Sequence, residues 1–312
     1  MTDAPWTIGP AAAGTRLDKF LGAVDRLGSR ARAASALERG KVYLNGAVAS
    51  VEQAAVHLRE GDVVDLWMDR PGTAKRRVAA IRAARPVPVV HEDEELLVLN
   101  KPPGLLVVPL ERRSAAPSVL ELIADRLRSH KRRPYVVHRI DRDTSGLVVF
   151  AKDARTQQQL RSQFERREPE RVYLAVVYGH PEPRSGTWRD RFVWDSKALL
   201  QRQTYPGDPR GQDAVSRYRV IESFETASLI EVKLTTGKRN QIRLQAHVHG
   251  HTLVGERRYV SGTGMAQPID FPRQALHAAH LEFRHPHNGR LMQFDAPLPS
   301  DLAALLERLR RH

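Results

Sequence analysis

The stretch His138–Lys152, with the sequence HRIDRDTSGLVVFAK, joins a dense run of polar side chains to an apolar strand. Its first half carries His, Arg, Asp, Thr and Ser, and Gly146 then relaxes the backbone before the apolar run. In a tight connection held by a sheet, polar groups can converge on a ligand while the sheet holds them still. The residues alone leave two interpretations open: a ligand site, or a charged turn whose Asp143 and Thr144 bond nearby backbone.

Short β-rich runs surround this stretch from Val89 onward, and a few helical segments separate them. The runs are HEDEELLVLNK, RPYVVHR, RVYLAVVYG, VSRYRVIES, ASLIEVKLTT, LHAAHLEFR and LMQFDAP. Ser118 followed by Glu121 forms a capping-box pattern before LELIADRL, and Asp153 can cap the helix that carries QQQLRSQF. An α+β domain with a large mixed, mostly antiparallel sheet is therefore predicted over residues 89–312.

A second, smaller αα-β unit is predicted over residues 15–67. Helices are expected over Arg16–Leu27 and Arg30–Arg39, followed by strands around an Asn-Gly turn. Asn-Gly supplies the positive φ angles that a two-residue hairpin needs, and the apolar run Val63–Trp67 predicts a closing strand. This segment is long enough for a small module beside a large domain.

The helix pair of the smaller unit has a basic surface. Ser29 is placed to cap its second helix and Gly40 to end it. Residues 68–88 then turn to Pro, Gly, Ala and Arg without an apolar period, which predicts a linker. The basic side chains of the pair are Arg16, Lys19, Arg26, Arg30, Arg32 and Arg39. Such a surface suits backbone phosphates, although a solvated helical face has the same composition.

The charge of the whole chain points to a polyanionic partner. Fifty Lys and Arg residues stand against thirty-six Asp and Glu residues among 312, a formal charge of +14. Lys and Arg neutralise phosphates and release counterions, so RNA or DNA is the expected partner. A proteome-wide bias towards Arg gives the same charge, so charge alone does not decide. Zero cysteines exclude disulfides, thiolate nucleophiles and cysteine-ligated zinc.

Other classes of protein are disfavoured by missing patterns. No stretch approaches the roughly 18 apolar residues of a membrane helix, and Met1–Gly14 lacks the pattern of a secretory signal. We therefore expect a cytoplasmic protein without a membrane segment. The chain has no GxxxxGK[ST] loop, and the run Ser261–Gly264 does not form a dinucleotide fingerprint.

The stretch HRIDRDTSGL resembles the HRLDxxTSGL signature of the RluA-type RNA pseudouridine synthases. Three further segments agree in order: KPPGLLVVP, RVYLAVVYG, and LTTGKRNQIRLQAHVHGHTLVGERRY followed by LHAAHLEFRHP. Together the similarity spans Val89 to Pro297. Residues 15–67 resemble an S4-type RNA-binding module, first described in a small-subunit ribosomal protein, through TRLDKFL, SRARAASALERGKVYLNG and EGDVV. The resemblance implies a pseudouridine synthase domain at 89–312.

The resemblance assigns roles to individual residues. Asp141 matches the essential carboxylate of the family, and Arg243 matches its basic partner. Tyr173 matches the tyrosine whose ring packs on the target base and whose hydroxyl helps to remove the C5 proton. Arg139 matches the arginine that occupies the position left by an extruded uridine, and Leu244 is expected to supply an apolar wall.

Further residues of the matching segments are expected to bind the RNA substrate. They are His138, Thr144 and Lys101 in the catalytic domain and Arg16, Arg30 and Arg32 in the small module. Because the product is an isomer of the substrate, no cofactor is implied. His247, His249 and His251 alternate within a predicted helix, which disfavours a metal site, since alternation suits one face of a strand.

The chain departs from the family pattern at four positions. Asn240 and Gln245 stand in GKRNQIRLQ where the family has histidines, Val108 stands where a histidine ends VHP, and Glu256 replaces the aspartate of LVGD. We expect these changes to affect RNA contacts and groups around the site more than the catalytic residues themselves. Activity is therefore predicted to persist.

Three functions remain to be distinguished. The first is isomerisation of specific uridines in structured RNA, with large-subunit ribosomal RNA favoured by analogy and transfer RNA as the alternative. The second is a non-catalytic RNA-binding or ribosome-assembly factor that has lost turnover. The third, a metal-dependent nuclease using Asp141 and Asp143, lacks further paired carboxylates. No protein partner is implied.

Overall fold

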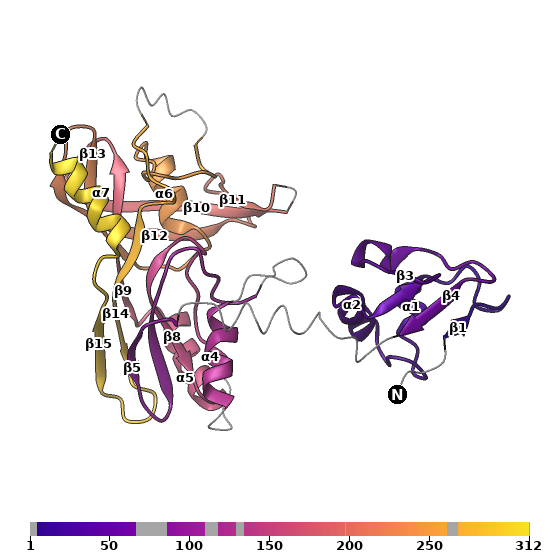
Figure 1. Ribbon diagram of the computed structural model, residues 1–312. Coiled ribbons are helices and arrows are strands. Elements are labelled where there is room, and N and C mark those ends of the chain that lie inside the picture. The colour runs from indigo at the N-terminus through magenta and orange to yellow at the C-terminus, as the bar shows by residue number, and fades with distance from the viewer. Residues whose placement is uncertain are drawn as a thin grey trace. The chain divides into compact units, whose positions relative to one another are not determined.

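The computed structural model describes residues 5–66, 86–109, 118–128, 134–196, 198–260 and 268–311. The chain divides into two compact units, one N-terminal and one that holds most of the residues from Arg85 onward. Figure 1 shows a small four-stranded sheet in the first and a large sheet in the second. The predicted linker at residues 68–88 lies outside the described residues as far as position 85.

The first unit is built on an antiparallel sheet in the order β1-β4-β2-β3. The strands are β1 Trp6–Thr7, β2 Val42–Leu44, β3 Ala47–Val48 and β4 Val63–Leu66. Asn45 and Gly46 have φ angles of 52° and 77°, so the predicted Asn-Gly hairpin is confirmed. Strand β1 was not predicted, because it lies before the module that the sequence pattern outlines.

Helices cover this small sheet and complete its core. Helix α2 spans Arg30–Glu38, and the Ser29 hydroxyl accepts a hydrogen bond from the Arg32 amide, as predicted. Helix α1 spans only Leu17–Leu21 and is shorter than predicted. The chain turns after it, because α2 begins against Gly22, where an added Cβ would lie 2.9 Å from the Arg30 nitrogen. A 3₁₀ helix, η1, covers Val51–Ala55.

The second unit is built on an eleven-stranded mixed sheet in the order β11-β10-β12-β13-β9-β14-β8-β6-β5, with β15 on β14 and β7 on β8. Among the described strands only β8 and β14 pair in parallel, so the predicted mostly antiparallel sheet is confirmed. The strands are β5 Val89–Glu92, β6 Leu96–Lys101, β7 Tyr135–Val136, β8 Ser145–Ala151, β9 Glu170–Tyr178, β10 Ser185–Asp195, β11 Leu200–Gln203, β12 Gln212–Ser223, β13 Ala227–Leu234, β14 Leu276–Arg284 and β15 Leu291–Asp295.

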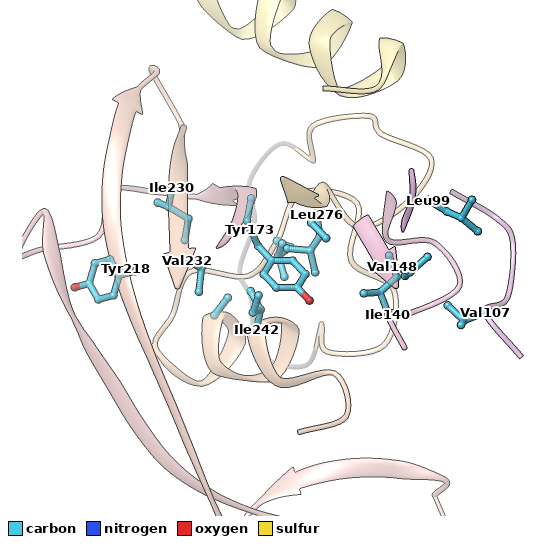
Figure 2. Packing of buried hydrophobic residues seen from close by; sticks show 14 of the residues in the cluster. Leu99, Val107, Ile140, Val148, Tyr173, Tyr218, Ile230, Val232, Ile242 and Leu276 are labelled. Atoms are coloured by element: carbon cyan, nitrogen blue, oxygen red, sulfur yellow. The ribbon is translucent and has the colours of Figure 1, made fainter. Parts of the chain in front are cut away.

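Both faces of the large sheet are covered by helices. The helices are α4 Val119–Arg128, α5 Ala154–Glu165, α6 Gln241–Val248 and α7 Ser300–Arg310. Alternate residues of β9 separate the faces: Tyr173 and Ala175 join the cluster that includes α4 and α6, whereas Val176 packs with α7. Helix α5 adds Leu160 to a further cluster on the face away from α6. Figure 2 shows the α6 side of this packing.

Two predicted caps are present in this unit. The Ser118 amide donates to the Glu121 carboxylate at 3.0 Å, and the Glu121 amide donates to the Ser118 hydroxyl at 3.4 Å. Asp153 accepts from the Thr156 amide at 2.8 Å and so begins α5. Within the described residues no helix is both long and apolar enough to cross a membrane.

Strands β8 and β14 approach closely at Gly146. This residue has a φ of 111°, and an added Cβ would lie 2.1 Å from the carbonyl oxygen of Ala278. Only glycine fits such a backbone conformation and such a close approach. The glycine of the HRIDRDTSGL stretch therefore allows the loop before β8 to lie directly against β14.

Candidate active site

Asp141 lies in the connection between β7 and β8, which backbone contacts hold in place. The Thr144 amide donates to the Asp141 carbonyl at 3.2 Å. The Arg273 guanidinium donates to the Asp143 carbonyl at 2.9 Å, and it is itself held by Asp301 of α7 at 2.7 and 3.0 Å. The carboxylate of Asp141 is about one-quarter exposed, so a ligand can reach it.

Arg243 links this carboxylate to α6. Its Nη1 atom lies 3.1 Å from Asp141 Oδ2. Its Nε and Nη2 atoms donate to the two carboxylate oxygens of Glu256 at 2.7 and 2.6 Å. Burial would lower the pKa of Arg243, but Glu256 and Asp141 outweigh burial and raise it, so the guanidinium stays charged. The paired contacts with Glu256 partly neutralise that charge and fix the plane of the Arg243 guanidinium.

Asn240 provides a second contact to the carboxylate. It precedes α6 in the left-handed conformation, with a φ of 53°. In the amide orientation that satisfies its neighbours, its nitrogen donates to Asp141 Oδ2 at 2.8 Å and Oδ1 at 3.0 Å. Its oxygen then accepts from the Tyr259 hydroxyl at 3.2 Å. Asn240 and Arg243 thus both donate to Asp141 and fix the orientation of its carboxylate.

Tyr173 lies beside Asp141 in a largely buried position on β9. Burial raises the pKa of its hydroxyl, Arg171 opposes this rise and Asp141 adds to it, so the phenol is protonated at neutral pH. Figure 2 shows the ring among Ile242 of α6 and Leu276 of β14. A planar base could pack on an aromatic surface held in this way.

Two adjoining cavities open at these residues. The smaller, of about 60 Å³, is lined by Asp141, Tyr173 and Arg243 together with Arg139 and Thr144. The larger, of about 470 Å³, is lined by Val137, His138, Arg139, Arg161, Phe164, Glu165, Arg167, Arg171, Tyr173, Leu234, Thr236, Gly237 and Lys238. Both include Arg139 and Tyr173. The structure therefore brings together the three residues predicted as catalytic, and places exposed Arg139 beside them.

Leu244 does not line either of these cavities, contrary to the prediction. It follows Arg243 by one residue on α6, a rotation of about 100° around the helix. Its side chain is buried in a separate cluster with Phe192, Ala214 and Tyr259. Its role is to hold α6 against the β10–β12 part of the sheet.

Lys101 is fully buried, so it is not positioned to contact RNA as predicted. Its ammonium group donates to the carbonyls of Pro102, Leu105 and Arg142 at 2.8, 2.9 and 2.9 Å. Burial lowers its pKa to about 7, although Asp143 opposes the shift. Lys101 therefore fastens the Asp141 loop to the segment that follows β6.

His138 is neutral and supports the wall of the larger cavity. Its Nε2 accepts from the Val149 amide at 3.2 Å, and its ring stacks on Phe164 with centroids 4.7 Å apart. Burial and the nearby Arg171 lower its pKa to about 3. Thr144 is buried as well, and its hydroxyl accepts from Gln274 at 3.4 Å.

The departures from the family pattern have structural explanations. Gln245 is fully buried, accepts from Ser216 at 2.7 Å and donates to Asp190 at 2.9 Å, so the expected RNA contact is wrong at this position. Val108 packs against the apolar core instead of facing RNA. Asn240 and Glu256 do lie around the site, as expected.

The three alternating histidines of α6 and the turn after it do not converge. His247 contacts the Thr252 hydroxyl, His249 contacts Asp190, and His251 contacts the Tyr178 carbonyl. Within the described part of the chain, no group of three or more metal-ligating side chains is close enough to hold a metal ion.

The arginines predicted in the small unit differ in their surroundings. Arg16 and Arg30 both pair with the buried Asp18, at 3.0 and 2.6 Å, while remaining partly exposed. The side chain of Arg32 is exposed. Part of the positive charge of this surface therefore stabilises its own fold.

Comparison with known proteins agrees with this geometry. A family profile described as RNA pseudouridylate synthase matches residues 95–248. Ribosomal large subunit pseudouridine synthase D of Zymomonas mobilis is 35% identical over 310 residues, covering 95% of this chain and 94% of that protein. The chain belongs to the RNA pseudouridine synthase family. The uncharacterized RNA pseudouridine synthase YlyB of Bacillus subtilis is 34% identical and covers 95% of each chain.

A solved structure supports the same fold. Human RNA pseudouridylate synthase domain containing 4 superposes with a TM-score of 0.61 at 23% identity, covering 76% of this chain and 97% of the human chain. The family profile and the relatives, not the structural likeness, confirm the RluA-type resemblance: this protein is an RNA pseudouridine synthase, which isomerises uridine in RNA. Arg171 and Lys238 also line the larger cavity but were not singled out from the sequence, because no motif distinguishes them from other basic residues.

Proposed function

We propose that this synthase modifies a uridine of large-subunit ribosomal RNA, with Asp141 as the reacting carboxylate. The relatives from Zymomonas mobilis and Pseudomonas aeruginosa, which match 95% or more of this chain, are both named ribosomal large subunit pseudouridine synthase D. The observation that carries the catalytic assignment is the 3.1 Å contact between Arg243 and Asp141 at the small cavity. A cytoplasmic location is part of this proposal.

The reaction breaks the bond between uracil N1 and ribose C1′, turns the base and joins C5 to C1′. The C5 proton leaves and N1 gains a proton, so the atoms balance without a donor or an acceptor. Asp141 can attack C1′ or remove the C2′ proton, and either step needs an ionised carboxylate. Arg243 and Asn240 donate to its oxygens and would hold the carboxylate in position.

The neighbours of Asp141 would position the base. The uridine must leave its stem to reach the cavity. Arg139 is exposed at the cavity and would fill the vacated position. The Tyr173 ring offers a surface for the turning base. Because its hydroxyl is protonated, Tyr173 can assist C5 proton removal only while passing on its own proton.

Residues 15–67 are proposed to act as an S4-type module that binds the same RNA. Its exposed cations would neutralise backbone phosphates, which fix register without reading sequence. Transfer RNA is the alternative substrate. In this proposal the small unit supplies affinity and the Asp141 cavity supplies the chemistry.

The test is to map pseudouridines chemically in total RNA from cells with and without the gene. One uridine of the large-subunit RNA should lose its modification without the gene and regain it with the wild-type protein. Asp141→Asn should not restore it, while binding the RNA within about threefold of wild type, since phosphate contacts remain. Loss of a pseudouridine from transfer RNA instead would contradict the proposed ribosomal substrate. Restoration of the modification by Asp141→Asn would contradict the catalytic role of Asp141.

A further inference from the structure

The larger cavity beside Tyr173 is strongly cationic. Five of its lining side chains are basic and one, Glu165, is acidic. The five basic residues are Arg139, Arg161, Arg167, Arg171 and Lys238. Of the residues that the structure describes, none forms a salt bridge with these five. His138 adds no charge, because burial and Arg171 keep it neutral. The lining thus holds five basic side chains that no described carboxylate pairs with, and one acidic side chain, Glu165.

Arg171 is partly buried at this cavity. Its Nε atom is buried, and no described residue accepts a hydrogen bond from it. Its guanidinium carbon lies 5.6 Å from the centroid of the Phe164 ring, which in turn stacks on His138. Partial burial of a cation that no described anion pairs with is costly, and a ligand that supplies negative charge and acceptor oxygens would recover part of that cost.

A glycine, Gly237, lies next to the Arg171 guanidinium. Gly237 faces the guanidinium so closely that an added Cβ would lie 2.5 Å from Arg171 Nη1. Gly237 and Lys238 follow β13 and line the same cavity. Glycine at this position therefore leaves room for the guanidinium, and the next residue adds a second cation.

We propose that this cavity is a phosphate-binding subsite for the RNA backbone flanking the target uridine, with Arg171 and Lys238 as its anchors. The proposal rests on the proposed function, because Tyr173 and Arg139 line this cavity and the Asp141 cavity alike. A nucleotide extruded into the smaller cavity carries its flanking phosphates to the adjoining one. Arg171 can offer two donors to a phosphate, and Lys238 a point charge.

The first test measures salt-dependent binding of full-length protein to transcribed large-subunit RNA. All variants carry Asp141→Asn, so turnover does not contribute. Arg171→Gln should lower the slope of log K against log salt by about 0.7 to 0.9 and raise Kd about tenfold. The control is Arg155→Gln, an exposed arginine on α5 outside the cavity, which should change neither. Equal slopes for the two variants would overturn the proposal.

Two further variants protect against misfolding of Arg171→Gln. Lys238→Gln should also lower the slope. Gly237→Ala displaces the Arg171 guanidinium but keeps its charge, so it should raise Kd several-fold if position matters. Gly207→Ala is its control, since there the added Cβ meets only Tyr205 at 3.6 Å. No change in Kd for both Lys238→Gln and Gly237→Ala would overturn the subsite.

A double-mutant cycle then identifies the phosphate. A short RNA containing the mapped uridine is made with a neutral methylphosphonate at either flanking position. The neutral group should weaken binding to protein with Arg171 and have little further effect with Arg171→Gln, because the two changes remove one interaction. Additive effects at both positions contradict the subsite. Failure of the wild type to modify any ribosomal RNA instead contradicts the proposed function, and the binding slopes remain measurable.

Discussion

Glu256 is the residue that sets the electrostatics of the site, although it does not touch the cavity. Its two carboxylate oxygens accept from Nε and Nη2 of the buried Arg243, while Nη1 contacts Asp141. Glu256→Gln leaves Arg243 buried with only Asp141 as a charged partner, so the free energy of unfolding should fall by about 3 kcal/mol. Urea denaturation measures this change.

The matched control is another glutamate paired with arginine. Glu231 contacts Arg219 at 3.2 Å, but both side chains are partly exposed. Glu231→Gln should therefore cost less than about 1 kcal/mol. Similar losses for the two variants would show that burial of the Arg243–Glu256 pair is not what stabilises the site.

Lys101 should make stability depend on pH. Its pKa is lowered to about 7 from an ordinary 10.5, mainly by burial, so between these values the unfolded chain holds a proton that the native chain has lost. The free energy of unfolding should therefore rise with pH across this window. The destabilisation caused by burying the charged ammonium is complete below pH 7 and is lost as the pH rises towards 10.5. Lys101→Met should remove this rise in urea titrations at pH 7 to 10. An unchanged slope in Lys101→Met contradicts the assignment.

At the residue level, the sequence predicted correctly which side chains lie together, while their catalytic roles stay predictions. Asp141, Tyr173 and Arg243 meet at one cavity, as expected from the signature. Lys101 and Gln245 did not face RNA, because burial and hydrogen bonding decide the position of a polar side chain, and neither is visible in a motif. Asn240 contacts Asp141 through a left-handed backbone conformation that sequence pattern does not specify.

At the scale of elements, the junction of β8 and β14 is a contact that tolerates no side chain at Gly146. Gly146→Ala would place a Cβ 2.1 Å from the Ala278 oxygen at a φ of 111°. The strands must separate, so unfolding free energy should fall by about 3 kcal/mol or more, and activity with it. In Gly207→Ala the added Cβ contacts no backbone atom, so its unfolding free energy should stay within about 1 kcal/mol of the wild type. Denaturation curves that coincide for the two variants contradict this account of the junction.

Elements were predicted best where the local chemistry is strong. The caps at Ser29, Ser118 and Asp153 and the Asn-Gly hairpin all appear as expected. Strand order could not be predicted, because β8 meets β14 across a long sequence separation that no local pattern encodes. The early end of α1 has the same origin, since the contact between Gly22 and Arg30 is tertiary.

At the scale of the whole molecule, affinity and chemistry should be separable. Arg16 and Arg30 form salt bridges with the buried Asp18, whereas Lys19 and Arg32 are exposed. The double variant Lys19→Gln, Arg32→Gln should therefore weaken RNA binding and reduce its salt slope by about 1 to 2, with kcat at saturating RNA unchanged.

The measurement combines filter binding over a salt series with release of label from C5 of uridine. Arg290→Gln, an exposed change outside the cavity in the larger unit, is the control and should leave both quantities unchanged. A fall in kcat for the double variant, or an unaltered slope, contradicts a phosphate-binding role for these two residues.

The parallel pairing of β8 with β14 also determines the stage of synthesis at which the Asp141 site can assemble. His277 lies opposite Ser145 in that pairing, and their side chains bond across 132 residues of chain. Contacts between such distant positions form late, because the loop between them must close before they are made. During synthesis the carboxylate of Asp141 therefore leaves the ribosome long before Arg243, Glu256 and β14 arrive. If the first unit binds RNA as proposed, the nascent chain would do so before the Asp141 site is assembled.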